Sequence, residues 1–167
     1  MTSQLAQLST VTGIDKMNST LETFIANMQS SQSLQMSNLI GRDVLVEGNQ
    51  LSFDGTGGYF GVELPISTDD LTVTINDAAG NQIRQLNFGN QSEGIIPMSW
   101  DGYDDNGTQV ENGNFTFNVS ATIDGEDVDV TSLSLTRINS ISTNGAGIKL
   151  NLGNSDSVTS EDLKQIF

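Results

Sequence analysis

The sequence predicts a mainly β protein that begins with a long α-helical arm. The apolar fraction is 35%, below the ~45–50% usual for globular domains, and Gly, Ser, Thr, Asn and Gln are abundant, which is typical of short strands joined by turns. Neither Gly nor Pro occurs from Ile14 to Ile40, whereas apolar and polar residues alternate in short runs beyond Asp43. The first pattern favours a helix and the second favours strands.

The helix is predicted to start at Thr12. The segment Thr12-Gly-Ile-Asp15 has the spacing of a capping box, which places a hydroxyl at the N-cap and a carboxylate near the positive helix end. Leu5 and Leu8 predict a shorter helical segment upstream. A helix that continues to Ile40 would span about 40 Å, which is too long for a small domain to cover.

The apolar residues of this helix recur at alternating steps of three and four, the spacing of a coiled-coil seam. They are Ile14, Met17, Leu21, Phe24 and Met28. The flanking positions carry Asn, Ser, Thr and Gln rather than charged pairs, so we expect weak, concentration-dependent pairing. An ordinary amphipathic helix packed on its own β body is the alternative. The length and the N-terminal position favour an assembly arm.

The β region divides at Pro65 and Arg137. Strand-like alternation before Pro65 and after Arg137 is too sparse for a stable domain, so these flanking segments are expected to pair with each other around a central β-sandwich. The expected units are therefore a helical arm, a flanking β unit and a sandwich, over residues 1–40, 41–64 plus 138–167, and 65–137. Within the sandwich, Asp124-Gly125 predicts a two-residue hairpin turn, because Gly accepts a positive φ.

Composition excludes several function classes. Lys and Arg total 6 against 21 Asp and Glu, and because the resulting charge of −15 repels anionic phosphates, we expect neither nucleic acid nor a membrane surface as a partner. The sequence contains neither Cys nor His, which removes disulfides, thiolate chemistry, the usual general base and most zinc sites. We therefore predict no catalytic, cofactor-binding or metal-binding residue, and we expect that the chain is not an enzyme.

The densest group of polar residues lies between two aromatic residues, Trp100 and Phe115. Its acidic side chains suggest a calcium loop, but Tyr103 occupies a position where a calcium loop needs an oxygen ligand. We expect a structural loop instead, in which Asp and Asn bond nearby backbone amides and the aromatic residues enter the core. The residues of this loop motif are Trp100, Asp101, Gly102, Asp104, Gly107, Gly113 and Phe115.

Five short sequence motifs occur one after another along the chain. They are SQLAQLSTVTGI at 3–14, QSLQ at 32–35, LIGR at 39–42, FGVEL at 60–64 and the Ser-Trp-Asp-Gly loop at 99–107. Together they resemble the bacterial flagellar hook-capping family, FlgD, from end to end. The family has a further N-terminal segment with an Asn-Gln-Asp-Pro motif, which this chain lacks.

The resemblance implies both a fold and a function. The fold is a tudor-like β domain from about 41–64 and 138–167, with an immunoglobulin- or fibronectin type III-like domain inserted. The function is that of a cap, exported through the flagellar type III channel, which sits as a small ring, a pentamer, at the distal tip of the growing hook and is absent from the finished flagellum. The implied partners are further copies of the chain and hook protein, with the hook-length control protein and the export apparatus as further candidates.

A binding module is the alternative function from another class. Beta-sandwiches with acidic loops often serve in carbohydrate or adhesion-type recognition outside the cell. The chain has only one Trp and two Tyr, so an aromatic platform for sugars is poorly supplied.

Overall fold

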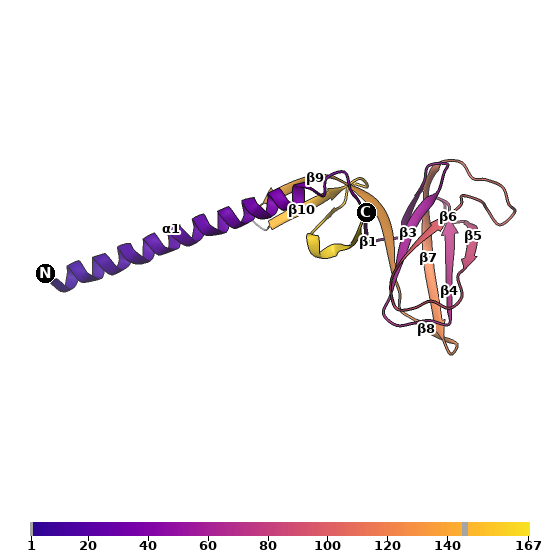
Figure 1. Cartoon of the computed structure of the whole chain (residues 1–167), viewed down its shortest axis with the longest axis horizontal. Coiled ribbons are helices and arrows are strands. Elements are labelled where there is room, and N and C mark those ends of the chain that lie inside the picture. Colours follow the sequence, from indigo (N-terminus) through magenta and orange to yellow (C-terminus); the bar gives the residue numbers. More distant parts are fainter. Residues whose placement is uncertain (1, 145–146) are drawn as a thin grey trace.

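The computed structural model describes residues 2–144 and 147–167, which form one long helix attached to an antiparallel β body. Helix α1 spans Thr2–Ser37 and projects from the body (Figure 1). The strands are β1 (Asp43–Glu47), β2 (Gln50–Phe53), β3 (Gly58–Leu64), β4 (Asp70–Asn76), β5 (Gln82–Asn87), β6 (Gly94–Trp100), β7 (Gly113–Ile123), β8 (Glu126–Val128), β9 (Thr131–Asn144), β10 (Gly147–Leu152), β11 (Ser157–Val158) and β12 (Leu163–Ile166), with a 3-10 turn at Ser160–Asp162. The mainly β class with an N-terminal helix is confirmed.

The predicted start of the helix is wrong. The helix already includes Thr2, and the Thr12 hydroxyl donates a 2.8 Å hydrogen bond to the carbonyl oxygen of Leu8, one turn earlier in the same helix. A Thr hydroxyl can therefore be satisfied inside a helix as well as at its cap. Gly13 does not interrupt the helix, since one Gly costs only about 1 kcal/mol relative to Ala. The 36 residues give a length of about 54 Å.

The helix ends where the chain turns into the β body. Gly41 has a φ of +84°, a conformation that glycine adopts without steric cost, and its N–H donates to the carbonyl oxygen of Ile138. Met36 and Leu39 pack against the body just before this turn. Within residues 2–144 and 147–167, no helix combines the length and apolar character that a membrane span needs.

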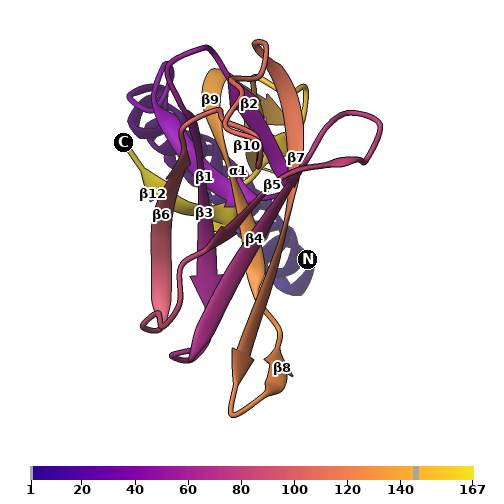
Figure 2. The ribbon, with the colours of Figure 1, turned by 90° about the vertical axis from the view of Figure 1, so that its right-hand side faces the viewer.

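The larger β unit has two layers. Strands β5, β4, β7 and β2 pair in that order, and β6, β3 and the first part of β9 form the second set. The two sets meet along one edge through a single pair, Phe53 with Gly58. Figure 2 shows β6 and β3 on one side of this unit and β4 and β7 on the other. Their inner faces share one apolar core, in which the rings of Phe60 and Phe117 lie 4.7 Å apart across the layers.

The smaller β unit lies next to the helix. Its core contains Val44 and Val46 of β1, Ile138 of β9, and Leu150 and Leu152 of β10. β1 pairs with β12 and with β9, so segments from the two ends of the β region lie side by side. β9 belongs to both units, because residues 131–134 pair with β3 and the part from Ile138 pairs with β10.

The sequence predicted that residues 41–64 form one unit with residues 138–167. In the structure, the strands of residues 41–64 are divided between the two cores. Only β1 joins the smaller core, whereas Leu51 and Phe53 of β2 and Phe60 and Val62 of β3 are buried in the larger core. Alternation along the chain identifies strands but carries no information about which strands they pair with. The boundary between the cores therefore falls near Gly48 instead of Pro65.

The hairpin predicted at Asp124-Gly125 is confirmed. Both residues have positive φ, 51° and 85°, as a type I′ turn requires, and Ile123 pairs with Glu126 across the turn.

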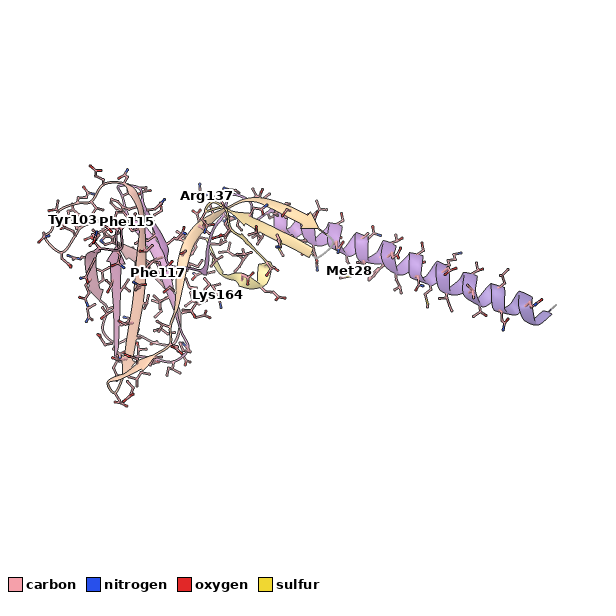
Figure 3. All side chains as sticks on the ribbon, turned by 180° about the vertical axis from the view of Figure 1, so that it is seen from behind. Met28, Tyr103, Phe115, Phe117, Arg137 and Lys164 are labelled. Atoms are coloured by element: carbon pink, nitrogen blue, oxygen red, sulfur yellow. The ribbon has the colours of Figure 1, made fainter. Side chains whose placement is uncertain are left out.

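Two ion pairs connect strands near the junction of the units. The Lys164 ammonium lies 2.8 Å from a Glu63 carboxylate oxygen and joins β12 to β3, and the Arg137 guanidinium contacts both oxygens of Asp43 at 2.8 and 3.0 Å. Figure 3 labels Arg137 and Lys164 on the part of the body next to the helix. The Lys164–Glu63 pair therefore links the two units, whereas the Arg137–Asp43 pair holds β9 against β1.

Candidate assembly interface and acidic loop

The five seam residues all lie on the exposed part of α1. Their side chains, Ile14, Met17, Leu21, Phe24 and Met28, are between 48% and 59% exposed. At 100° per residue they fall on one stripe of the helix, and Ile25 lies beside them. Figure 3 shows Met28 on the helix, away from the larger β unit. The structure thus places the seam in solvent, and the alternative of a helix packed along its own body does not describe it.

Only the C-terminal end of α1 touches the body. Within the described residues its main contacts are with β9 and β10; Met36, in its last turn, packs against the smaller core, as does Leu39 just beyond the helix. Every residue from Gln7 to Gln32 is exposed. More than six helical turns are therefore exposed to solvent, without a buried side chain to stabilise them.

Opposite the seam, the middle of the helix is polar and almost uncharged. Ser19 and Thr23 lie there, one turn apart, and the Thr23 hydroxyl donates to the Ser19 carbonyl oxygen at 2.9 Å. Residues 1–40 hold just three charged side chains, those of Asp15, Lys16 and Glu22. Long-range electrostatics consequently oppose the approach of another helix very little.

The second predicted group, the acidic loop, is built on a buried tryptophan. Trp100 is 1% exposed, and its ring lies 5.5 Å from that of Phe53 and 5.0 Å, edge to face, from that of Phe115. Its indole Nε1 donates to the carbonyl oxygen of Tyr103 at 2.9 Å. Figure 3 shows Tyr103 and Phe115 together at the end of the body far from the helix. Through this hydrogen bond, the buried indole of Trp100 holds the first turn of the loop against the core.

Gly102 closes the loop over the aromatic cluster. It has a φ of +77°, and a Cβ atom at this position would overlap the Phe53 ring. The carbonyl oxygen of Gly102 accepts from the Val110 N–H at 2.9 Å, which joins the two ends of the loop. A side chain is thus excluded both by backbone conformation and by space.

The loop carboxylates are occupied by backbone amides. Asp101 accepts from the Tyr103 N–H at 3.1 Å, and one Asp104 oxygen accepts from the N–H groups of Asn106 and Thr108 at 2.9 and 2.7 Å. Arg84 of β5 donates to the Asp104 carbonyl oxygen at 2.9 Å. These bonds give the loop a fixed shape and dock it on β5.

The remaining motif residues serve the same loop. Gly107 has a φ of +79° in open space, and Gly113 starts β7 opposite Phe53. The structure therefore brings the seven motif residues into one loop and its aromatic base. Phe53 and Arg84 also belong to this arrangement, and sequence reasoning missed them because no local pattern links either residue to the loop.

Acid should destabilise the folded chain in part through these carboxylates. Hydrogen bonding by the Thr108 backbone N–H, helped by Asn106 and the charge of Arg84, holds the pKa of Asp104 below its ordinary value. Bonds to Thr56, Asn81 and Thr159 likewise lower the pKa values of three other aspartates, Asp54, Asp77 and Asp162. When folding lowers the pKa of a carboxyl group, the ionised group stabilises the folded state at any pH above the pKa that it has in the unfolded chain. This stabilisation is lost as the pH falls through the pKa of the folded state.

We expect the free energy of unfolding, measured by denaturant titration, to fall below about pH 4. Asp104→Asn should weaken this acid dependence. An identical pH profile for the variant and the wild type would contradict the role given to Asp104.

The loop does not gather a metal-binding set of side chains. In the described ranges, 2–144 and 147–167, no three acidic, His or Cys side chains converge in a way that could hold a metal ion. The two loop carboxylates described above already accept hydrogen bonds from the loop itself. The geometry supports a structural loop.

Comparisons with known sequences point to one family, through a match to part of the chain and through relatives aligned over all of it. A family profile described as the FlgD Ig-like domain matches residues 48–125, close to the larger β unit. The basal-body rod modification protein FlgD of Escherichia coli is 35% identical over 176 residues, covering all of this chain and 76% of that protein. FlgD of Salmonella typhimurium is 34% identical, with 75% of its length covered.

Solved structures are also similar. FlgD from P. aeruginosa aligns with a TM-score of 0.66 and 26% identity, covering 77% of this chain and 98% of that one. FlgD from Xanthomonas campestris, whose crystal structure was described in terms of the hook capping essential for flagellar assembly, aligns with a TM-score of 0.67 and 26% identity over 81% of this chain and 99% of its own. The chain belongs to the FlgD family.

Proposed function

We propose that the chain is a subunit of the flagellar hook cap. It sits at the distal end of the growing hook, promotes assembly of hook protein and leaves before the flagellum is complete. The support comes from the similarity to basal-body rod modification proteins over the whole chain and to the X. campestris protein described in terms of hook capping. The subunit reaches the tip through the type III export channel.

The exposed helix carries this proposal. An isolated helix is marginally stable in water, and α1 is rich in Ser, Thr and Asn, which are weak helix formers. Its stability must come from packing of the apolar seam against a partner. A seam with a/d spacing pairs readily with a copy of itself, so the proposed assembly is a homo-oligomer, a ring of five subunits, whose helices lie together.

The β units serve as rigid walls. We assign the smaller unit to a tudor-like domain and the larger one to an immunoglobulin- or fibronectin type III-like domain. Carboxylates and uncharged polar side chains dominate the surface of the larger unit, which discourages lasting adhesion to hook protein passing beneath the cap. The chain acts by binding instead of by catalysis.

The carbohydrate-binding alternative is not favoured. Trp100, the one tryptophan, is buried in the core of the larger unit, which leaves Tyr59 and Tyr103 as the exposed aromatic rings of that unit. Its indole N–H is also already bonded to Tyr103.

A deletion strain of the source bacterium tests the function. We expect electron microscopy of its basal bodies to show rods without hooks, and an immunoblot to find hook protein lost to the medium, because incoming subunits are no longer retained. A plasmid copy of the gene should restore hooks. Hooks of normal length in the deletion strain would overturn the proposal.

A further inference from the structure

The FGVEL motif, which lies on β3, faces both β units. Three of its side chains, those of Phe60, Val62 and Leu64, are buried in the core of the larger unit. Gly61 and Glu63 lie on the opposite face of the strand, because side-chain direction alternates from one residue to the next. On that face, both residues meet side chains of the smaller unit.

A leucine of the smaller unit fills the space over Gly61. Leu45 of β1 is 1% exposed, yet it belongs to neither of the two apolar cores. A Cβ atom at Gly61 would lie 2.8 Å from Leu45 Cδ1 and 3.4 Å from the Ile96 carbonyl oxygen. Gly61 does not have a positive φ, so its backbone conformation does not require glycine. The close approach of Leu45 is what excludes a side chain here.

Strand β12 is tied to the same face of β3. The Lys164 ammonium lies 2.8 Å from a Glu63 carboxylate oxygen, and each side chain is 32% exposed. β9 runs between β1 and β3 at this point, where the fully buried Leu133 pairs with Glu47 on one side and with Gly61 on the other. Strands β12, β1, β9 and β3 are therefore paired in one continuous series across both units.

The other crossing between the units, the segment from β1 to β2, is also fastened. The Gln50 N–H donates to the Ser134 hydroxyl oxygen of β9 at 2.8 Å. The Asn49 carbonyl oxygen accepts from the Phe117 N–H of β7 at 2.9 Å. A hinge needs a few residues that are free to change φ and ψ, and these bonds oppose such a change.

We infer that the two β units turn as one rigid body, and that the angle between them is set by Leu45 seated over Gly61. Relative motion is the usual behaviour of two units in one chain unless a large apolar interface joins them. Here a buried apolar contact, an ion pair and two fastened crossings take that role.

The direction of the arm follows from the same contact. Met36 and Leu39 pack the end of the helix against the smaller unit, so a fixed angle between the units also fixes the larger unit relative to α1. In the proposed cap, this holds the walls at a constant angle to the assembled helices. That consequence rests on the proposed function, whereas the rigidity is a property of the single chain.

Distances between spin labels test the rigidity. The chain contains no cysteine, so a pair of introduced cysteines carries the only labels. Lys149→Cys on β10 with Asn118→Cys on β7 spans the two units, and Ser99→Cys on β6 with Asn118→Cys spans the larger unit alone; all three residues are exposed. Dilution of the labelled chain with unlabelled wild type removes distances between copies.

Pulsed electron spin resonance should give one distance between the units, with a distribution as narrow as that within the larger unit. Several separate distances, or a distribution much broader than the one within the larger unit, would overturn the inference. Hook protein takes no part in this measurement, so its outcome is independent of the proposed function, which the deletion strain tests.

Two variants test the contact itself. Gly61→Val should shift or broaden the distance between the units, because the new side chain occupies the space of Leu45. Leu45→Ala should broaden it without adding bulk, which keeps the test valid if Gly61→Val does not fold. Trp100 fluorescence establishes that the larger unit is folded in each variant.

Gly113→Val is the matched control. Gly113 also lies on a strand of the larger unit and has no positive φ, and the nearest atom to its missing Cβ is 4.0 Å away. This variant should leave the distance between the units unchanged. An unchanged distance in folded Leu45→Ala and Gly61→Val chains as well would overturn the role given to this contact.

Discussion

Replacing Leu21 and Phe24 with aspartate is expected to abolish self-association of the chain. Both side chains are more than half exposed in the single chain, at the centre of the seam on α1. Burial of a Leu or a Phe side chain stabilises an interface by about 1.5–3 kcal/mol. Loss of both from each subunit should therefore weaken association roughly 100-fold or more, before the cost of burying two carboxylates is added. Analytical ultracentrifugation over a concentration series measures the change.

The opposite face of the same helix provides a control. Ser19→Asp with Thr23→Asp adds the same two charges one helical turn apart, on the polar side and close to Lys16. This variant should associate as the wild type does, since an exposed carboxylate there remains hydrated. Equal weakening by both double variants would mean that charge on the helix, and not the seam, determines association.

Replacing Gly102 with alanine is expected to destabilise the larger β unit strongly. The new Cβ atom would overlap the buried ring of Phe53, which supports Trp100, and the backbone would have to keep a φ of +77°. A left-handed conformation costs a non-glycine residue about 1–2 kcal/mol and overpacking about 1–3 kcal/mol, so the free energy of unfolding should fall by about 2–5 kcal/mol. Denaturant unfolding monitored by Trp100 fluorescence measures this.

Gly107→Ala separates the two contributions. Gly107 has almost the same φ, +79°, but no atom lies within 4 Å of the position of its missing Cβ. Only the conformational penalty should remain, about 1–2 kcal/mol. If the two alanine variants lost equal stability, the contact between Gly102 and Phe53 would have no part in holding the loop.

The sequence predicted the helix and its apolar stripe, but not the residue at which the helix begins. The a/d spacing of Leu21 and its neighbours identifies one apolar stripe, because side-chain direction in a helix repeats every 3.6 residues. The start was misplaced because Thr12 can bond either at an N-cap or to the Leu8 carbonyl oxygen within the helix. Local sequence does not distinguish the two bonds.

Strands and turns were predictable, but their partners were not. The turn at Asp124-Gly125 follows from the adjacent Asp and Gly, whereas the burial of Phe53 under Gly102 depends on a contact between residues far apart in the sequence. For the same reason, β2 and β3 were predicted in the wrong unit, because their alternating apolar residues fit either core. The hydrogen bonds of the loop aspartates could be predicted from their residue type, because a short carboxylate side chain accepts hydrogen bonds from nearby backbone amides.

The central claim is that the chain caps the hook through the exposed seam of α1. The most direct test is electron microscopy of basal bodies from a strain whose only copy of the gene carries Leu21→Asp and Phe24→Asp, beside a strain with Ser19→Asp and Thr23→Asp. Our account predicts rods without hooks in the first strain and normal hooks in the second, at equal levels of exported protein. Hooks of normal length in the first strain would contradict it.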